Sequence, residues 1–164
     1  MIQVSVTSSR HFGIHICLDR GSRMDSITKQ QRSRNMAKIK GKDTKPELII
    51  RRYLFKHGFR FRINQRIGKA RPDIVLKKWK CCIFVHGCFW HRHTGCKLAY
   101  TPKSNTEFWK KKFAGNQNRD LQNLSILKNE GWHTGVIWEC SIRNGTFKEA
   151  NISDMIKTGT CWEI

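Results

Sequence analysis

Hydrophobic and polar residues between positions 44 and 58 follow the period of an amphipathic helix. Thr44 and Glu47 have the spacing of an N-terminal capping box, and Gly58 has the position of a C-terminal stop. Glu47 and Ile50 share the apolar face, because side chains three or four residues apart lie together on a helix. We therefore predict a helix that ends before Gly58, with the Glu47 carboxylate on the core side either as a helix cap or as a site residue.

Alternating and apolar segments predict three strands after this helix. Residues 59–64 alternate between apolar and basic side chains, as a half-buried strand does, and apolar runs follow at 73–78 and 81–86. A tight connection at 79–80 makes the last two a predicted hairpin. In the third strand the side chains are expected to face alternate sides of the sheet: Cys82, Phe84 and His86 on one, and Cys81, Ile83 and Val85 on the other.

The second half of the chain predicts two helices and a buried strand. A long helix is expected from about Asn105 to Gly131, with Gly115 as a point where it could break. Residues 132–138 read as a buried strand, and a second capping box at 146–149 predicts a short C-terminal helix. The order α-β-β-β-α-β-α predicts an α/β sandwich in which a three-stranded meander is joined by a helix to a parallel strand.

Length and composition indicate one folded domain. The chain has 164 residues, 38% of them hydrophobic, and six tryptophans, which suffices for a real core. Residues 1–31 are polar and basic without clear periodicity, so we predict a flexible N-terminal tail there and a single domain over 32–164. The basic segment 32–42 is expected to be either a helix or a solvated tail.

Charge and cysteine content narrow the function class. With 32 basic and 12 acidic residues, the formal net charge is +20, which predicts a polyanionic partner or a merely basic protein. No apolar run approaches the roughly 18 residues of a membrane span, and the N-terminus lacks the apolar core of a secretion signal. Seven cysteines without such a signal favour metal-bound thiolates in a reducing cytoplasm over a disulfide scaffold.

The segment HGCFWHRHTGC, residues 86–96, carries the densest chemistry in the chain. Cys88, His93 and Cys96 have the spacing of zinc ligands within one loop. Cys140, just past the predicted strand at 132–138, is the best distant candidate for a fourth ligand. Four protein ligands would make a closed, structural site, and the alternative is that these cysteines are free core residues.

A second group of residues is suited to hydrolytic chemistry. Asp73 opens a strand after a proline and could bind a hard cation such as magnesium, or serve only as a strand cap or turn residue. The predicted hairpin places Asp73 opposite the 85–86 end, close to His86 and His91, which can transfer protons near neutral pH. Asp120, from the long helix, could orient one of these histidines or could be a surface partner of a basic residue.

Four motifs in order, GKARPDIV, CIFVHGCFWHRHTGC, TEFWKKKFAGNQNRD and GWHTGVIWEC, resemble the very short patch repair (Vsr) endonucleases from Gln31 to about Ile142. The resemblance implies a restriction-endonuclease-like fold of the PD-(D/E)xK superfamily, with an α-β-β-β-α-β sandwich, a mixed central sheet and a zinc-bound loop. It implies a magnesium-dependent enzyme that nicks DNA 5′ of the thymine in T·G mismatches, which arise when methylated cytosine deaminates.

Carried over by motif, the resemblance implies roles for individual residues. Asp73 would be the catalytic aspartate and a magnesium ligand, with the backbone carbonyl of Val85 as a further ligand. His91 would help to activate the attacking water, and Asp120 would support His91. The remaining catalytic positions match Glu47 and His86.

The resemblance also implies a zinc site and a DNA interface. The four zinc ligands would be Cys88, His93, Cys96 and Cys140, with the extra residue at Thr94–Gly95 requiring a slight bulge. The residues expected to contact DNA are the wedging aromatics Phe89, Trp90 and Trp109, and Arg34 and Met36 in the basic arm. From the residues alone, Phe89 and Trp109 would instead be core side chains.

We expect a monomer that acts on double-stranded DNA, with other mismatch-repair proteins as candidate partners and no membrane association. Two alternatives remain at this point. A zinc-stiffened DNA-binding module without catalysis explains the charge, the aromatics and the cysteines, but not the convergence of Asp73, His86, His91 and Asp120. A related nuclease that acts on unmismatched DNA would use the same catalytic residues.

Overall fold

The chain consists of two units, residues 1–39 and 40–164, and the computed structural model describes residues 28–38 and 41–164 of them. In the first unit, helix α1 (Lys29–Ala37) begins with a capping box in which Thr28 and Gln31 bond reciprocally. The basic segment at 32–42 is thus helical up to Ala37. The predicted flexible tail lies, except for residues 28–31, outside the described residues.

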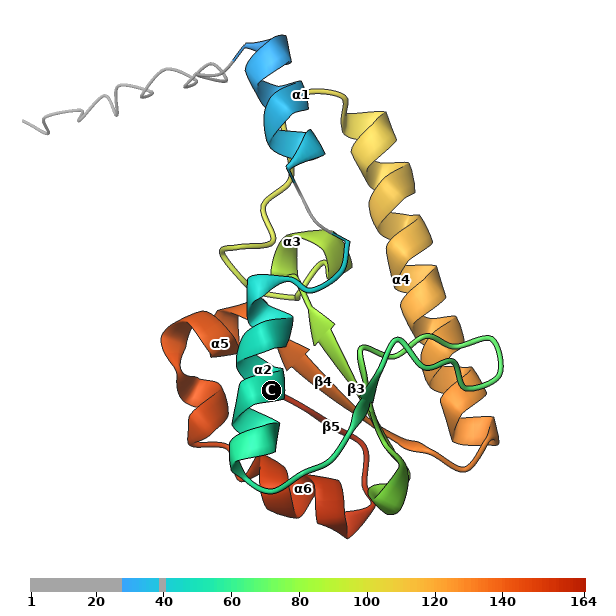
Figure 1. Cartoon of the computed structure of the whole chain (residues 1–164). Helices are drawn as coiled ribbons and strands as arrows, with labels where there is room; N and C mark the ends of the chain where they lie inside the picture. The colour runs from blue at the N-terminus through green and yellow to red at the C-terminus, as the bar shows by residue number, and fades with distance from the viewer. Residues whose placement is uncertain (1–27, 39–40) are drawn as a thin grey trace, which may run out of the picture. The chain divides into compact units, whose positions relative to one another are not determined.

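A five-stranded mixed sheet forms the centre of the second unit (Figure 1). Its strands are adjacent in chain order: β1 (Arg62–Ile63), β2 (Ile74–Leu76), β3 (Cys81–His86), β4 (His133–Trp138) and β5 (Trp162–Glu163). The β1–β2 and β2–β3 pairs are antiparallel, whereas β4 is parallel to both β3 and β5. The long crossover between β3 and β4 carries their parallel connection, as parallel pairing requires.

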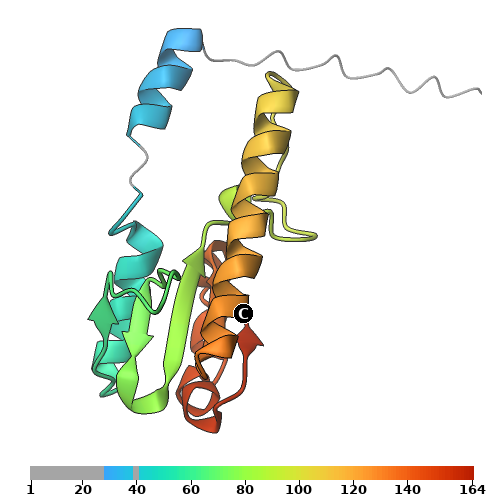
Figure 2. The same cartoon turned by 90° about the vertical axis from the view of Figure 1, so that its right-hand side faces the viewer.

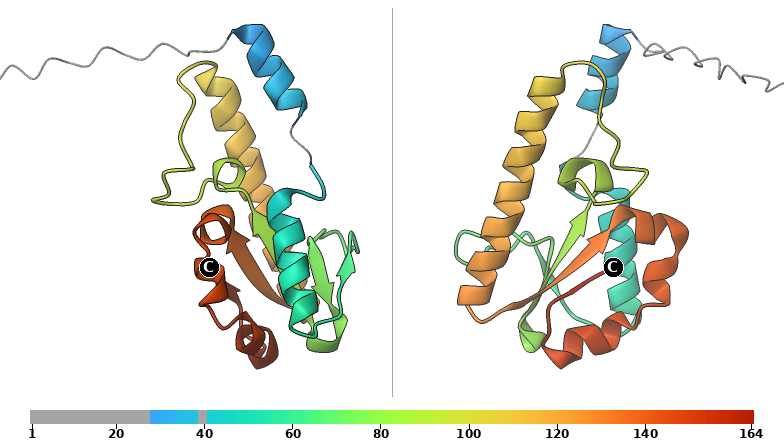
Figure 3. Two further views of the ribbon diagram at one scale, coloured as in Figure 1. Left: turned by 60° about the vertical axis from the view of Figure 1, so that its left-hand side comes forward. Right: turned by 180° about the vertical axis from the view of Figure 1, so that it is seen from behind.

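Helices cover both faces of this sheet. The helices of the second unit are α2 (Lys45–Lys56), α3 (Cys88–His91), α4 (Thr106–Asn129), α5 (Glu139–Asn144) and α6 (Ile152–Thr158), with short 3₁₀ turns η1 (Lys77–Trp79) and η2 (Thr146–Lys148). Figure 2 shows α2 and α4 on opposite sides of the sheet, and Figure 3 shows the C-terminal helices beside α2. This three-layer arrangement is consistent with the restriction-endonuclease-like fold that the motifs predict.

The core divides into two main clusters, one on each face of the sheet. On the α2 face, Ile50 and Leu54 pack with Ile83 of β3 and Ile156 of α6, all fully buried. On the α4 face, the members are Ala70, Val75, Cys82, Phe84 and Leu127. The predicted alternation of side chains along β3 is therefore confirmed, since odd and even positions belong to different clusters.

The strongest local patterns are confirmed. Helix α2 begins at the Thr44–Glu47 capping box and stops before Gly58. The hairpin of β2 and β3 forms around η1. Gly115 does not break α4, which runs for 24 residues, because one helical glycine costs only about 1 kcal/mol.

Other elements differ from the predictions. The strand expected at 59–64 is only two residues long, because Phe59 is buried in the core and Arg60 stacks on Phe55 at the end of α2. The loop expected at 87–105 begins with the helical turn α3. Helix α5 and strand β5 were not predicted.

The predicted capping box at 146–149 is wrong. The Thr146 hydroxyl donates to the Ser141 carbonyl, and the Glu149 amide bonds the Thr146 carbonyl within η2. The C-terminal helix instead begins after Asn151, whose side chain accepts a hydrogen bond from the Asp154 amide. Among the described helices, none is long and apolar enough to cross a membrane.

Candidate active site and cysteine–histidine cluster

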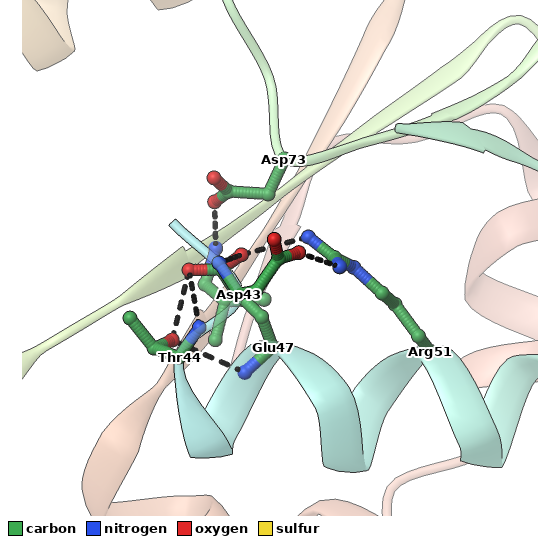
Figure 4. Close-up of polar contacts among 6 residues, drawn as sticks. Asp43, Thr44, Glu47, Arg51 and Asp73 are labelled. Atoms are coloured by element: carbon green, nitrogen blue, oxygen red, sulfur yellow. Dashed lines mark hydrogen bonds and ion pairs between the residues drawn. The ribbon is translucent and has the colours of Figure 1, made fainter. Parts of the chain in front are cut away.

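Asp73 lies at the N-terminal end of β2, where the hairpin places it beside the end of β3. Its Oδ2 accepts a hydrogen bond from the Val85 amide at 2.8 Å (Figure 4). Its Oδ1 makes no hydrogen bond within the described part of the chain. The predicted approach of Asp73 to the 85–86 end is thus confirmed, whereas the role of the Val85 carbonyl as a metal ligand stays a prediction.

The environment of Asp73 disfavours its charged form when no cation is present. Burial raises the pKa of Asp73 to about 6, the Val85 hydrogen bond opposes this rise, and the nearby Glu47 carboxylate adds to it. His91 and Arg51 lower the pKa of Asp73 by smaller amounts. A carboxylate in such a place gains from a bound cation, which would offset the burial of its charge.

Three other predicted residues converge at the C-terminal end of β3. His86 ends β3, His91 ends α3, and Asp120 projects from the middle of α4. His91 Nδ1 lies 2.6 Å from Asp120 Oδ2, and His86 Nε2 lies 4.0 Å from Asp120 Oδ1. The two imidazole rings stack at 3.9 Å between centroids with an interplanar angle of 6°.

Hydrogen bonding assigns a proton to one nitrogen of His91. A carboxylate can only accept hydrogen bonds, so the Nδ1–H of His91 donates to Asp120 and leaves Nε2 as the basic nitrogen. Burial, and secondly the neighbouring His91, lower the pKa of His86 to about 4, against the opposing effect of Asp120. His86 is therefore neutral at pH 7.

Glu47 is buried at the first turn of α2, next to Asp73 (Figure 4). Its Oε1 accepts hydrogen bonds from the Thr44 hydroxyl at 2.8 Å and from the Thr44 amide at 3.5 Å, and the bond from the amide completes the capping box. Its Oε2 pairs with Nη2 of Arg51, also at 2.8 Å. Glu47 is thus both a cap and a neighbour of the candidate catalytic carboxylate, so the two interpretations made from the sequence are compatible.

The four predicted zinc ligands come together from α3, the loop after it and the start of α5. The cluster comprises Cys88, His93, Cys96 and Cys140, whose ligand atoms all lie within 4.8 Å of one another. His93 Nδ1 lies 3.7 Å from Cys88 Sγ and 3.3 Å from Cys140 Sγ. Ligands of a tetrahedral zinc stand about 3.5 Å apart, so three thiols and one imidazole in this arrangement suit that metal.

His91 and His93 face different groups. His93 stacks on Trp138 at 4.2 Å between ring centroids and faces the cysteines, whereas His91 faces Asp120. Arg92 between them adopts a left-handed backbone conformation (φ 58°), and Gly95 does the same (φ 71°). The expected bulge at Thr94–Gly95 stays a prediction.

An aromatic surface lies over α3 and the N-terminal half of α4. We define it as Phe89, Trp90, Tyr100, Phe108 and Trp109. The ring of Phe89 lies 5.0 to 5.3 Å from four neighbouring rings, including Trp109 and the buried Phe113. Phe108 and Tyr100 are 61% and 64% exposed, and Phe89, Trp90 and Trp109 are half-buried. The core interpretation of Phe89 and Trp109 is thus only partly met, since both reach the surface.

Arg34 and Met36 are both exposed on α1, which belongs to the first unit. Met36 is 38% exposed, so it is one of the larger apolar side chains that the described chain leaves open to solvent. Their contact with DNA stays a prediction.

Two contacts that shape the site are not predicted by the sequence. Arg51 pairs with Glu47 one helical turn away, and Asn116 donates a hydrogen bond through Nδ2 to the Trp90 carbonyl at 2.9 Å. Asn116 is buried and lies four residues before Asp120, on the same face of α4. A polar residue at i−4 from a site carboxylate was the signal that could have identified it.

These side chains combine a cation-seeking carboxylate with a histidine–aspartate pair, and an exposed aromatic surface adjoins them on a basic protein. The fold and the site together define a nuclease. A family model described as "DNA mismatch endonuclease Vsr" matches residues 24–97. The chain belongs to the Vsr family and is a DNA-nicking endonuclease, a hydrolase that acts on DNA.

Similar proteins extend the match beyond that segment. The type II nicking enzyme V.NmeAIP of Neisseria meningitidis is 41% identical over 133 residues, 81% of this chain and 94% of its own. The DNA mismatch endonuclease Vsr of Escherichia coli is 40% identical over 119 residues, 73% of this chain and 76% of its own. The type II nicking enzyme V.XorIIP of Xanthomonas oryzae is 34% identical over 132 residues, 80% and 96% respectively.

Proposed function

We propose that this enzyme nicks double-stranded DNA immediately 5′ of the thymine in a T·G mismatch and that the reaction depends on magnesium. The observation that carries the proposal is the position of the Asp73 carboxylate and the His91–Asp120 pair at one end of β3, next to the aromatic surface. The mismatch specificity is supported by the name of the Escherichia coli relative, a DNA mismatch endonuclease.

Asp73 would hold the magnesium ion, with the backbone carbonyl of Val85 as a second ligand. The residues fit this role, because Oδ1 of Asp73 has no hydrogen-bond partner in the described chain and the site already disfavours an uncompensated carboxylate. Magnesium commonly binds through one or two carboxylates plus phosphate oxygens and waters, so a single aspartate is sufficient. When bound, the ion would neutralise phosphate charge and polarise the attacking water.

His91 would take the proton from the attacking water through Nε2. Its Nδ1–H is already engaged with Asp120, which fixes the tautomer and would stabilise the imidazolium as it forms. The neutral His86 ring, stacked on His91, would keep the plane of that imidazole fixed. Glu47 would complete the acidic edge beside Asp73.

Zinc at the cluster of Cys88, His93, Cys96 and Cys140 would be structural. Four protein ligands leave no open coordination position, so the site has no place for a substrate or a reactive water. The cluster joins the loop after α3 to the start of α5, and a bound metal would stiffen that loop.

The aromatic surface would recognise the mismatch by insertion. Phe89, Trp90 and Trp109 would wedge between base pairs, and a mispaired step costs less to unstack than a paired one. Arg34 and Met36 on α1 would contact the DNA as an arm. We propose that the enzyme acts as a monomer, with other mismatch-repair proteins as partners, and that magnesium and zinc are its metals.

The deciding experiment incubates the purified enzyme and magnesium with end-labelled duplexes in a set of flanking contexts. Each context is made with one T·G mismatch and with the matched T·A pair, and an EDTA arm and Asp73→Ala serve as controls. We expect a single nick 5′ of the mismatched thymine that EDTA and Asp73→Ala abolish. Equal cutting of T·G and T·A duplexes would leave a nuclease and refute the mismatch specificity.

A further inference from the structure

Arg51 makes a forked contact with two carboxylates at the start of α2 (Figure 4). Nη2 lies 2.8 Å from Glu47 Oε2, and Nη1 pairs with Asp43 Oδ1. The Arg51 and Glu47 side chains are 12% and 9% exposed, whereas Asp43 is 57% exposed. The Arg51–Glu47 contact is therefore largely shielded from solvent, unlike a typical surface ion pair.

The helix cap does not require the contact between Arg51 and Glu47. The cap is already complete through Oε1 of Glu47, which accepts from the Thr44 hydroxyl at 2.8 Å and the Thr44 amide at 3.5 Å. Oε2 accepts hydrogen bonds from the Asp43 amide at 3.2 Å and from the Arg51 guanidinium. Both oxygens of Glu47 are thus occupied, and the carboxylate has one fixed orientation.

The fixed carboxylate matters because of its neighbour. Figure 4 shows the Glu47 and Asp73 carboxylates close to each other, and the charge of Glu47 adds to the rise in the pKa of Asp73 that burial causes. Among the described residues, Arg51 is the one cationic side chain that contacts Glu47. Without it, Glu47 would be a buried charge with no ionic partner, and Oε2, the oxygen that Arg51 contacts, would keep only the hydrogen bond from the Asp43 amide at 3.2 Å.

We propose that Arg51 is a positioning residue that fixes the Glu47 carboxylate beside Asp73. It would thereby determine the geometry of the acidic edge, by which we mean the pair of carboxylates of Glu47 and Asp73. The proposal rests on the proposed function of that edge. Arg51 acts through Glu47, so its effect depends on the presence of the Glu47 charge. A bidentate guanidinium suits this role because its planar fork reaches two carboxylates at once.

A double-mutant cycle tests the dependence. The variants are Arg51→Met, Glu47→Gln and the two combined, and Arg52→Met, an exposed arginine on the same helix, matches the change of charge. Single-turnover nicking is measured at saturating enzyme and magnesium. We expect Arg51→Met to slow nicking about tenfold in the parent and less than twofold in the Glu47→Gln background. The proposal is overturned if Arg51→Met slows nicking equally with and without Glu47→Gln. It is also overturned if the nicking rate of Arg51→Met lies within twofold of that of Arg52→Met.

Melting of the same variants without magnesium or DNA gives a readout that does not require activity. We expect Arg51→Met to lower the melting temperature by about 5 °C, because it leaves a buried charge unpaired, and Glu47→Gln to recover most of that loss. Additive losses in the combined variant overturn the coupling. If the parent enzyme nicks no duplex, the proposed function fails, while the melting cycle still decides whether Arg51 acts through Glu47.

Discussion

The contact between His91 and Asp120 leads to a quantitative prediction for Asp120→Asn. The substitution keeps the shape of the side chain but removes its charge. In the parent, Asp120 accepts the His91 Nδ1–H across 2.6 Å, so it orients the ring and would stabilise the imidazolium that forms during the reaction. An asparagine can present its NH₂ group to Nδ1 instead, which would favour the wrong tautomer.

The size of the effect follows from the role of this pair. A positioned general base contributes about 10²- to 10⁴-fold to the rate, and His91 can act as one only if Nε2 carries the free lone pair. The Asp120 carboxylate fixes that tautomer through a 2.6 Å hydrogen bond between side chains that are 26% and 18% exposed. Loss of the correct tautomer should therefore slow nicking about a thousandfold, which is about 4 kcal/mol in the barrier.

The assay is single-turnover nicking of a T·G duplex at saturating enzyme and magnesium, with Glu107→Gln as the matched control. Glu107 lies on the same helix with its side chain 84% exposed, so its substitution removes the same charge away from the imidazoles. We expect Asp120→Asn to bind the T·G duplex normally and to nick it about a thousandfold more slowly. A rate within fivefold of the parent would refute the role assigned to this pair.

Four further predictions follow from the same contacts. Asp73→Ala should abolish nicking while zinc content and T·G binding in gel shifts stay near parental values; full nicking would reject the mechanism. Cys140→Ser should lower zinc content after dialysis and lower the melting temperature, and one retained zinc per chain with unchanged melting would exclude Cys140 as a ligand. Because the folded-state pKa of His86 is about 4, below its usual 6.5, its contribution to stability is present above pH 6.5 and lost as the pH falls toward 4, by about 3 kcal/mol. Denaturant unfolding from pH 7.5 to 4.5 should therefore show a steeper loss for the parent than for His86→Asn, and equal slopes would contradict it. Asn116→Leu removes the bond to the Trp90 carbonyl and should weaken both T·G binding and nicking about tenfold, whereas normal binding would show that α3 does not depend on it.

The parts of the fold that the sequence predicts are those determined by neighbouring residues. Helix α2 follows from its capping box and periodicity, and the hairpin follows from two apolar runs with a short connection. The hairpin register in turn places Asp73 against Val85 across 12 positions. By contrast, β5 has two residues and depends on long-range bonds, such as the Trp138 amide to the Ile164 carbonyl at 2.7 Å, which no local pattern records.

The candidate site shows the same division. The spacing of Cys88, His93 and Cys96 is visible in one loop, so their convergence is predictable. The partner of His91 is not predictable in this way, because Asp120 lies 29 positions away in the sequence and any of several carboxylates could have bonded to the imidazole ring. The motif resemblance supplied that assignment, since packing of α4 on the sheet determines it and the local sequence does not.

The short helix α3 joins the parts of this site. Its four residues differ in direction because each step around a helix turns about 100°, so Cys88 faces the cysteine–histidine cluster, Phe89 the aromatic surface and His91 Asp120. A single helical turn is not stable on its own, and α3 therefore depends on external contacts. Two contacts serve this purpose: Cys88 is fully buried against β4, and Asn116 bonds the backbone one residue before His91. The aromatic surface and the proposed catalytic histidine are therefore both held by α3. Their relative position depends on the contacts that α3 makes with β4 and α4.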